Sequence, residues 1–373
     1  YAYDAAGRMT SMTDAAGNTW TYTYDKVGRL VSTKDPAGGV TSTVYDAMGQ
    51  TVSSTGANGG VTRYTYDAAG RVTKVTDALG NASTRTYDAN GNLLSVTDRT
   101  GARTTYAYDA AGRMTSMTDA LGNVTTYTYD ALGRMTQTTT PGGAESSTEY
   151  DSLGRSTKRT DALGFATQYT YDALGRVTKI AYADGSTVSY TYDANGQVLT
   201  VADQLGGVTA YAYDDAGRMT SSTDPMGHVT GYEYDAAGNL LKQTDALGNA
   251  TTYTYNANGR VASVTDAEGS TVRYAYDSRG NVASVTDPEG GVTRYQYDLS
   301  GNLSKVTDAE GNTTTYAYDL LDRQTGVTDG RGNTWTYAYD AEGRIVSTKD
   351  PLNYSASRSY DALGRLVSET DAN

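Results

Sequence analysis

The sequence predicts an all-β protein in which tandem 21-residue β-hairpins form one long antiparallel meander. Tyr recurs with a spacing of 21 residues at 18 positions, from Tyr3 to Tyr360, without an insertion or deletion. Two Asp-to-Gly turns divide each repeat into two short segments. The composition agrees with strands and turns, because Tyr and Thr favour strands and the 42 Gly favour turns. We expect no helix.

In the first turn of each repeat, the recurring Tyr begins a Y-D-x-x-G motif that is most often followed by Arg. Asp follows the Tyr in 17 repeats, with Asn256 as the exception, and Gly follows three residues later in 17, with Asp322 as the exception. The Asp can accept a hydrogen bond from the backbone two residues on, and Gly takes the positive φ that closes the turn. Representative motif residues are Tyr24, Asp25, Gly28, Arg29, Tyr66, Asp67, Gly70, Arg71, Tyr171, Asp172, Gly175 and Arg176.

A second turn of the same chemistry lies ten residues after the first Asp. Representative pairs are Asp77 with Gly80 and Asp119 with Gly122. The segments between turns, such as 61–66 and 71–76, have the length of an ordinary strand. Each repeat is therefore predicted to be one hairpin, linked to the next repeat by a further hairpin turn.

The strands are predicted to have one aromatic face and one face of small residues. Trp20, Tyr22 and Tyr24 are two residues apart and share a face, because side chains alternate along a strand. Val72 and Val75 are three apart, which predicts a β-bulge or burial on both faces. We expect the Tyr of the first turn to be mostly buried, and its hydroxyl to bind turn carbonyls, Asp or Arg of adjacent repeats.

The length of the array predicts a curved assembly. About 36 strands at roughly 4.8 Å each would make a flat sheet about 170 Å wide, and open sheets of more than about ten strands curl, split or close. A β-propeller is rejected because the sequence shows no alternation between odd and even repeats. We expect residues 1–373 to be a single continuous array of about 18 repeats, cut from a longer chain, that spirals into a hollow shell, tube or filament.

The sequence YDAAGR at 66–71, repeated every 21 residues, closely resembles the YD-repeat or rearrangement-hotspot (RHS) family over the whole chain. In that family, found in bacterial RHS and Tc toxins and in teneurins, the repeats form a β-strip that spirals into a hollow shell. The resemblance implies enclosure of a C-terminal toxic polypeptide in the toxins and a place in an adhesion ectodomain in teneurins. The Asp-Pro-x-Gly-Leu core motif that precedes the toxin is not recognisable here, so the self-cleaving Asp pair is assigned to no residue.

The sequence holds no recognisable catalytic or metal-binding constellation. His228 is the single His and occupies a turn column that elsewhere holds Asn, so it is interpreted as a substituted turn residue. The segment 88–92 begins like a calcium loop, but its twelfth position is Arg rather than Glu. Gly56, Thr140 and Tyr182 replace the second Asp and are interpreted as drift in a tolerant array. We expect no enzyme activity, cofactor or metal.

The predicted function is a non-catalytic structural scaffold of a secreted or cell-surface bacterial protein. Its candidate partners are an enclosed C-terminal polypeptide and further copies of itself in a filament. The net charge of −13 argues against nucleic acid, and no apolar run approaches the roughly 20 residues of a membrane span. The alternative is an adhesion or carbohydrate-binding surface that presents repeated Tyr rows to a cell-surface glycan. Trp20 and Trp335, in identical GNTWTY contexts, are candidate aromatic ligand residues.

Overall fold

The computed structural model describes residues 1–371, and each repeat supplies two strands. The odd-numbered strands end at the Tyr of the Y-D motif. They are β1 (Ala2–Tyr3), β3 (Thr19–Tyr24), β5 (Val40–Tyr45), β7 (Val61–Tyr66), β9 (Ala82–Tyr87), β11 (Arg103–Tyr108), β13 (Val124–Tyr129), β15 (Glu145–Tyr150), β17 (Ala166–Tyr171), β19 (Thr187–Tyr192), β21 (Val208–Tyr213), β23 (Val229–Tyr234), β25 (Ala250–Tyr255), β27 (Thr271–Tyr276), β29 (Val292–Tyr297), β31 (Thr313–Tyr318), β33 (Thr334–Tyr339) and β35 (Ser355–Tyr360).

The even-numbered strands follow the Y-D-x-x-G turn. They are β2 (Met9–Thr13), β4 (Leu30–Lys34), β6 (Thr51–Thr55), β8 (Val72–Thr76), β10 (Leu93–Thr97), β12 (Met114–Thr118), β14 (Met135–Thr139), β16 (Ser156–Thr160), β18 (Val177–Ala181), β20 (Val198–Ala202), β22 (Met219–Thr223), β24 (Leu240–Thr244), β26 (Val261–Thr265), β28 (Val282–Thr286), β30 (Leu303–Thr307), β32 (Gln324–Thr328), β34 (Ile345–Lys349) and β36 (Leu366–Thr370). Each begins one residue later than expected, because the Arg after the Gly belongs to the turn.

All 36 strands of the described chain form one open antiparallel sheet, which confirms the predicted fold class. Each strand pairs with the strands before and after it, as β7 does with β6 and β8. Tyr66 pairs with Val72, but Thr65 pairs with Lys74, so Thr73 is an extra residue in β8. This bulge recurs at the same place in every repeat and explains the three-residue spacing of Val72 and Val75, because it returns both side chains to the Tyr face.

The two turns of each repeat lie on opposite edges of this ribbon, because successive hairpins reverse direction. In the Y-D turn at Asp67, the backbone N–H of Gly70 donates to the Asp67 carbonyl at 3.0 Å. Gly70 has φ 82° and Gly175 has φ 83°, in the left-handed region that glycine adopts without steric cost. Two non-glycine residues take the same role, Asp322 with φ 58° and Asn353 with φ 71°.

The sheet is a single layer, so no second sheet covers the side chains of either face. Among residues 1–371, no large apolar side chain is fully buried. The Tyr column is of intermediate burial from Tyr24 to Tyr360, so each ring is mostly covered, as expected, but none is fully buried. The preceding column, represented by Thr65 and Ala107, is exposed in every repeat. The predicted contrast between the faces is therefore real, but with no second layer to cover it, the Tyr face keeps part of its ring surface accessible.

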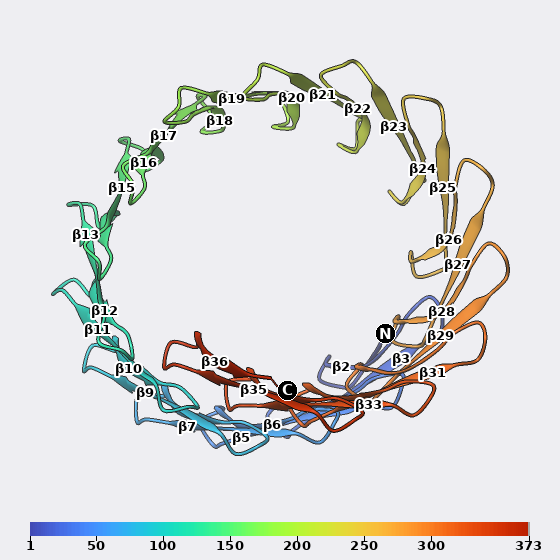
Figure 1. The fold of residues 1–373 in the computed structure, drawn as a ribbon, viewed down its shortest axis with the longest axis horizontal. Helices are drawn as coiled ribbons and strands as arrows, with labels where there is room; N and C mark the ends of the chain where they lie inside the picture. Colours follow the sequence, from blue (N-terminus) through green and yellow to red (C-terminus); the bar gives the residue numbers. More distant parts are fainter. Residues whose placement is uncertain (372–373) are drawn as a thin grey trace.

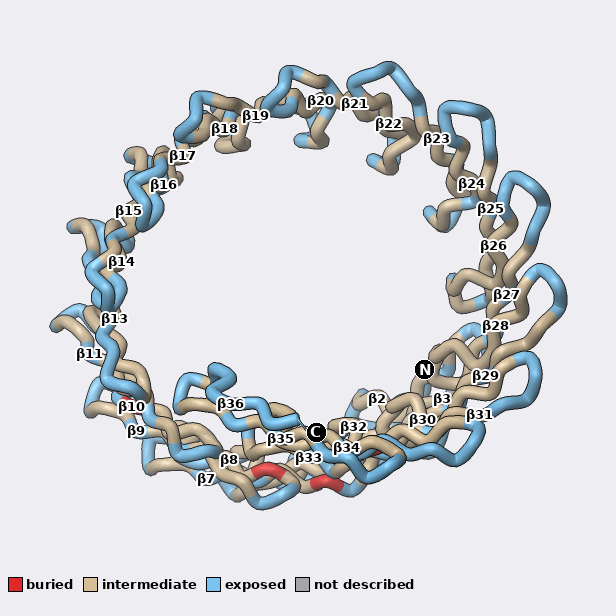
Figure 2. The backbone as a smooth tube through the Cα atoms, viewed as in Figure 1, coloured by how far each residue is buried: buried red, intermediate tan, exposed pale blue. Residues whose placement is uncertain are grey.

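The ribbon curves into a ring that closes and then overlaps itself, so that the repeats around residues 14–99 lie beside those around residues 258–342 (Figure 1). Contacts between the overlapping coils join residues 243 to 264 apart. Dividing these separations by the 21-residue period gives about twelve repeats per turn of the spiral. Few of the described residues are buried (red in Figure 2), and two of them, Gly39 and Gly60, face backbone carbonyls of the later coil at Leu299 and Leu320. The others are Asp77, Ser95 and Gly326.

Candidate functional site

A ladder of Tyr, Asp and Arg runs along the Y-D edge of the ribbon. Within one turn, Asp67 Oδ1 accepts the backbone N–H groups of Ala69 at 2.9 Å and Arg71 at 3.0 Å. Its second oxygen, Oδ2, accepts the Arg71 Nε–H at 2.7 Å. One carboxylate therefore holds both the turn backbone and the guanidinium group that follows it.

Where the turn carries Arg, the ladder in most cases also reaches the next repeat. The Arg71 guanidinium lies 4.8 Å from the centre of the Tyr87 ring, and its Nη1 donates to the Asp88 carbonyl at 3.0 Å. The Tyr87 hydroxyl donates back to the Val72 carbonyl at 2.9 Å. The same return bond to the first residue of the preceding even strand joins all repeats from Tyr24 to Tyr360. The phenols thus bind carbonyls at the start of an even strand, and not the turn carbonyls, Asp or Arg that were predicted, while Arg covers many of their rings.

The electrostatics of the ladder keep its groups in the protonation states that these bonds require. The backbone N–H of Arg71 lowers the pKa of the Asp67 carboxyl, and the Arg71 side chain adds to this effect. Desolvation raises the pKa of the Tyr66 hydroxyl above its ordinary value. At neutral pH, Asp67 is therefore an ionised acceptor and Tyr66 a neutral donor.

The structure also places the other residues that the sequence singled out. Asp77 and Asp119 open second turns on the opposite edge, where Gly80 and Gly122 have φ 88° and 85°. His228 is exposed, and its Nδ1 lies 2.8 Å from Asp224 Oδ2, the position that an Asn side chain takes in other repeats. It acts as a turn residue. No group of three or more potential metal ligands occurs in the described part of the chain.

Trp20 lies on β3 and Trp335 on β33, 315 residues later in the chain. Each pairs across the sheet with an apolar residue of the preceding strand, Met12 and Val327 respectively. Trp20 is half-buried and Trp335 is 37% exposed. Their role as ligand residues remains a prediction.

A polar seam joins the two overlapping coils. Here second turns of the earlier coil meet Y-D turns of the later coil, and the contacting residues are Asp14 with Asn258, Asp35 with Arg279, Asn58 with Asp322, and Arg99 with Glu342. The Arg99 side chain also lies 3.3 Å from Asp77, which is only 4% exposed. Ion pairs and hydrogen bonds to amide and carboxylate groups therefore join the coils along the seam.

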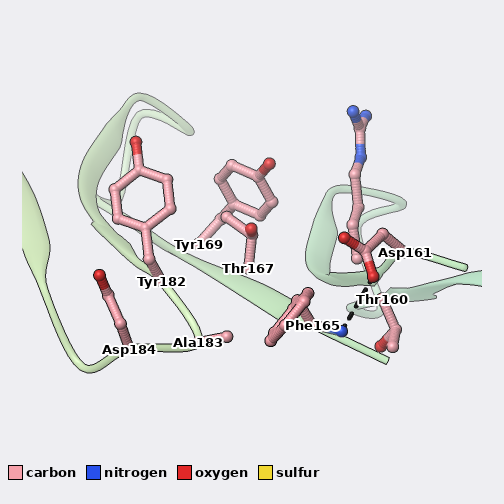
Figure 3. Close-up of a pocket in the computed structure, with 9 residues that line it drawn as sticks. Thr160, Asp161, Phe165, Thr167, Tyr169, Tyr182, Ala183 and Asp184 are labelled. Carbon is pink, nitrogen blue, oxygen red and sulfur yellow. Dashed lines mark hydrogen bonds between the residues drawn. The ribbon is translucent and has the colours of Figure 1, made fainter. Parts of the chain in front are cut away.

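Away from the seam, a groove of about 530 Å³ opens over β16, β17 and the turn after β18. Figure 3 shows Phe165, Tyr169 and Tyr182 along it, with Thr167 between them and Asp184 beside Tyr182. The Phe165 backbone N–H donates to Asp161 Oδ1 at 2.9 Å, which closes the neighbouring turn.

Comparison with known protein families identifies the repeat. A sequence model of the RHS repeat matches nine segments that together cover residues 3–40 and 192–373, more than half of the chain. This chain belongs to the RHS-repeat family. The teneurin YD-shell model matches the RHS repeats at residues 55–179 and 105–203. No curated protein matches the chain as a whole.

Solved structures show the same fold for this RHS array. The TcdB2-TccC3 crystal structure superimposes with a TM-score of 0.67 at 18% identity, over 98% of this chain and 24% of the other. The Photorhabdus luminescens Tc holotoxin pore gives a TM-score of 0.66 at 19% identity, over 95% of this chain and 22% of that one. The RHS array therefore spans less than a quarter of either chain.

In residues 1–371, no helix is long and apolar enough to cross a membrane.

Sequence reasoning missed the seam and the groove. The seam joins residues more than 240 positions apart, as Arg279 and Asp35 are. A weak signal was present, because Asn258, Arg279 and Glu342 occupy a Y-D turn position that holds Ala or Leu in most earlier repeats. The groove was visible only as separate departures from the repeat, of which Tyr182 was interpreted as drift.

Proposed function

We propose that this array is a non-catalytic wall segment of a hollow shell, in a secreted or cell-surface bacterial protein, and that the complete shell encloses a C-terminal polypeptide. The observation that carries the proposal is the closure of a single-layered ribbon into an overlapping ring (Figure 1). Residues 1–373 would form one uninterrupted part of that wall.

The physical argument starts from what a one-layer sheet can and cannot do. A globular β-protein covers its apolar face with a second sheet, whereas here the described residues bury no large apolar side chain completely. Stability comes instead from the Tyr–Asp–Arg ladder and the seam, both of which follow the edges of the ribbon. The described strands form one sheet with no second sheet packed on its broad faces, which suits a wall that separates an inside from an outside.

Shell enclosure is tested best on the protein encoded by the complete gene. Limited proteolysis should leave any segment downstream of the array intact while the shell is native, and cleave it rapidly once the shell is unfolded by acid. A matched variant with Arg279→Ala, which removes a seam contact, should expose the same segment at a higher pH than the native protein. Cleavage of the downstream segment at the same rate with and without a folded shell would overturn the proposal.

One observation favours the adhesive alternative: the rings of the Tyr face stay partly accessible along the whole ribbon. Against it, the Y-D tyrosines are already engaged, since each hydroxyl from Tyr24 onward donates to a backbone carbonyl and many rings are covered by Arg. Binding to a glycan array that is lost on substituting several Y-D tyrosines, with the ring still closed, would favour adhesion over enclosure.

A further inference from the structure

The groove over β16–β18 is the place where the repeat changes in several columns at once. Arg159 stands in a strand column that holds Val, Met, Thr or Ser in most repeats. Phe165 is the single Phe of the chain and replaces a turn residue that is usually Asn or Gly, and Tyr182 replaces the second-turn Asp. These three residues, far enough apart to look unrelated in the sequence, line one groove in the structure.

The turn at Tyr182 has been rebuilt around the loss of its Asp. The Tyr182 N–H still donates to the Ser186 carbonyl at 2.9 Å, and the Gly185 N–H to the Tyr182 carbonyl at 3.0 Å. The missing side-chain acceptor is supplied by Asp184, whose Oδ1 accepts the Ser186 N–H at 2.9 Å and the Ser186 hydroxyl at 2.7 Å. The turn therefore does not need the Tyr182 side chain, which is directed into the groove (Figure 3).

The aromatic groups of the groove also stand outside the ladder. Phe165 is 59% exposed, a high fraction for a large apolar ring. Within residues 1–371 the hydroxyls of Tyr169 and Tyr182 make no hydrogen bond, unlike those of the Y-D tyrosines. For Tyr169 this holds equally for its equivalents in other repeats, such as Tyr64. The Arg159 guanidinium lies 5.9 Å from the centre of the Tyr169 ring. Three rings and two phenols are thus left available to a ligand.

We propose that this groove binds a short neutral saccharide of one or two rings. A pyranose has an apolar face of C–H groups, which stacks on aromatic rings such as Phe165 and Tyr182, and a rim of hydroxyls that needs donors and acceptors. The groove supplies acceptors at Asp161 and Asp184 and hydroxyls at Thr167 and both tyrosines. Its volume of about 530 Å³ lies in the range of small-ligand sites.

The charges of the groove select against other small ligands. Two carboxylates, Asp161 and Asp184, outnumber the one guanidinium of Arg159, so an anionic sugar or phosphate would meet net repulsion. The hydrogen bond from the Ser186 side chain lowers the pKa of Asp184, which is therefore an ionised acceptor at neutral pH. The groove lies in a part of the ring away from the seam. Saccharide binding in the groove therefore neither requires nor excludes the enclosure of a polypeptide by the shell.

The test uses the purified chain and four disaccharides as probes: maltose, cellobiose, lactose and N,N′-diacetylchitobiose. Titration calorimetry and saturation-transfer NMR should detect at least one of them with a Kd of about 5 mM or tighter. Phe165→Asn and Tyr182→Asp should each weaken it by at least about tenfold. Both changes restore the usual turn residue of the repeat, so the variants should melt at the temperature of the native chain or higher.

Tyr354→Asn is the matched control. Tyr354 is an exposed aromatic residue in the same column as Phe165, but the following second turn carries Asp371 in place of a Tyr. Its loss should leave saccharide affinity unchanged. The proposal is overturned if none of the four probes binds, if Phe165→Asn and Tyr182→Asp bind as tightly as the native chain, or if an Arg-rich peptide binds while the saccharides do not.

Discussion

Replacing Arg279 with Ala should open the overlap between the two coils of the spiral. Arg279 is 12% exposed and makes three contacts at once. Its Nε lies 2.8 Å from Asp35 Oδ2 of the earlier coil, and its Nη1 and Nη2 donate to the carbonyls of Asp298 and Leu299 at 2.7 Å each. The guanidinium thus joins the earlier coil to two consecutive repeats of the later one.

The expected magnitude follows from these contacts. Hydrogen bonds to a charged group contribute about 1.5–3 kcal/mol each, and breaking a fully buried ion pair costs about 3–5 kcal/mol. Asp35 is 24% exposed and keeps the N–H bonds of Ala37 and Gly39 after the substitution, so the ion-pair cost must be reduced. We expect the contact between the coils to weaken by about 2–4 kcal/mol, which is roughly a 30- to 1,000-fold change in the closed-to-open ratio.

Spin labels across the overlap can measure this change, because the chain has no Cys of its own. Labels on Thr41→Cys and Gln296→Cys, both on exposed strand positions, should give a narrow distance distribution in the native chain and a broad, longer one with Arg279→Ala. Arg273→Ala is the control, because Arg273 is exposed and forms no ion pair within residues 1–371. An unchanged distribution in the Arg279 variant would refute the assignment of closure to this seam.

A second substitution approaches the same contact by steric means. Gly39 is buried in the overlap, and a Cβ there would lie 2.5 Å from Arg279 Nη2 and 2.7 Å from the Leu299 carbonyl oxygen. Gly39→Ala should therefore broaden the same distance distribution. If it does so while Arg279→Ala does not, the fit of the backbones rather than the charge pair holds the coils together.

Three further predictions concern the ladder and the turns. Tyr171→Phe loses the 2.6 Å bond to the Ser156 carbonyl and should lower the free energy of unfolding by about 1 kcal/mol in chemical denaturation; no change would mean that water replaces the phenol fully. Gly175→Val should lower the free energy of unfolding by about 1–2 kcal/mol because φ is 83°, whereas Asn353→Gly, at φ 71°, should raise it by up to about 1 kcal/mol. Hydrogen exchange of the two turns measures both changes, and equal protection of the turns in both variants would contradict the argument. The pKa values of the Y-D aspartates are depressed in the folded chain, so the stability that these groups contribute is lost as pH falls through their folded pKa values. The pKa values of the Y-D tyrosines are raised, so their contribution is lost as pH rises above about 10. The melting temperature should therefore fall below about pH 4 and above about pH 10 and stay level between these values.

Much of the local structure could be predicted because its causes lie within a few residues. The Asp67 carboxylate and Gly70 are part of one turn, so their spacing alone specifies the turn that both edges repeat. Likewise, Val72 and Val75 indicated the bulge because only an extra residue puts both on one face. The degree of Tyr burial could not be predicted this way, since it depends on whether a second layer covers the face.

The sequence by itself determined the class, the period and the two turns of every hairpin, because those depend on alternation and backbone conformation over 21 residues. Only the tertiary structure decided the curvature of the ribbon, the count of about twelve repeats per turn and hence the partners across the seam. Small rotations between neighbouring hairpins add up over the array, and no single repeat specifies their sum. For the same reason Phe165 and Tyr182, each one departure among many in the sequence, became neighbours in one groove only when β16, β17 and β18 were laid side by side.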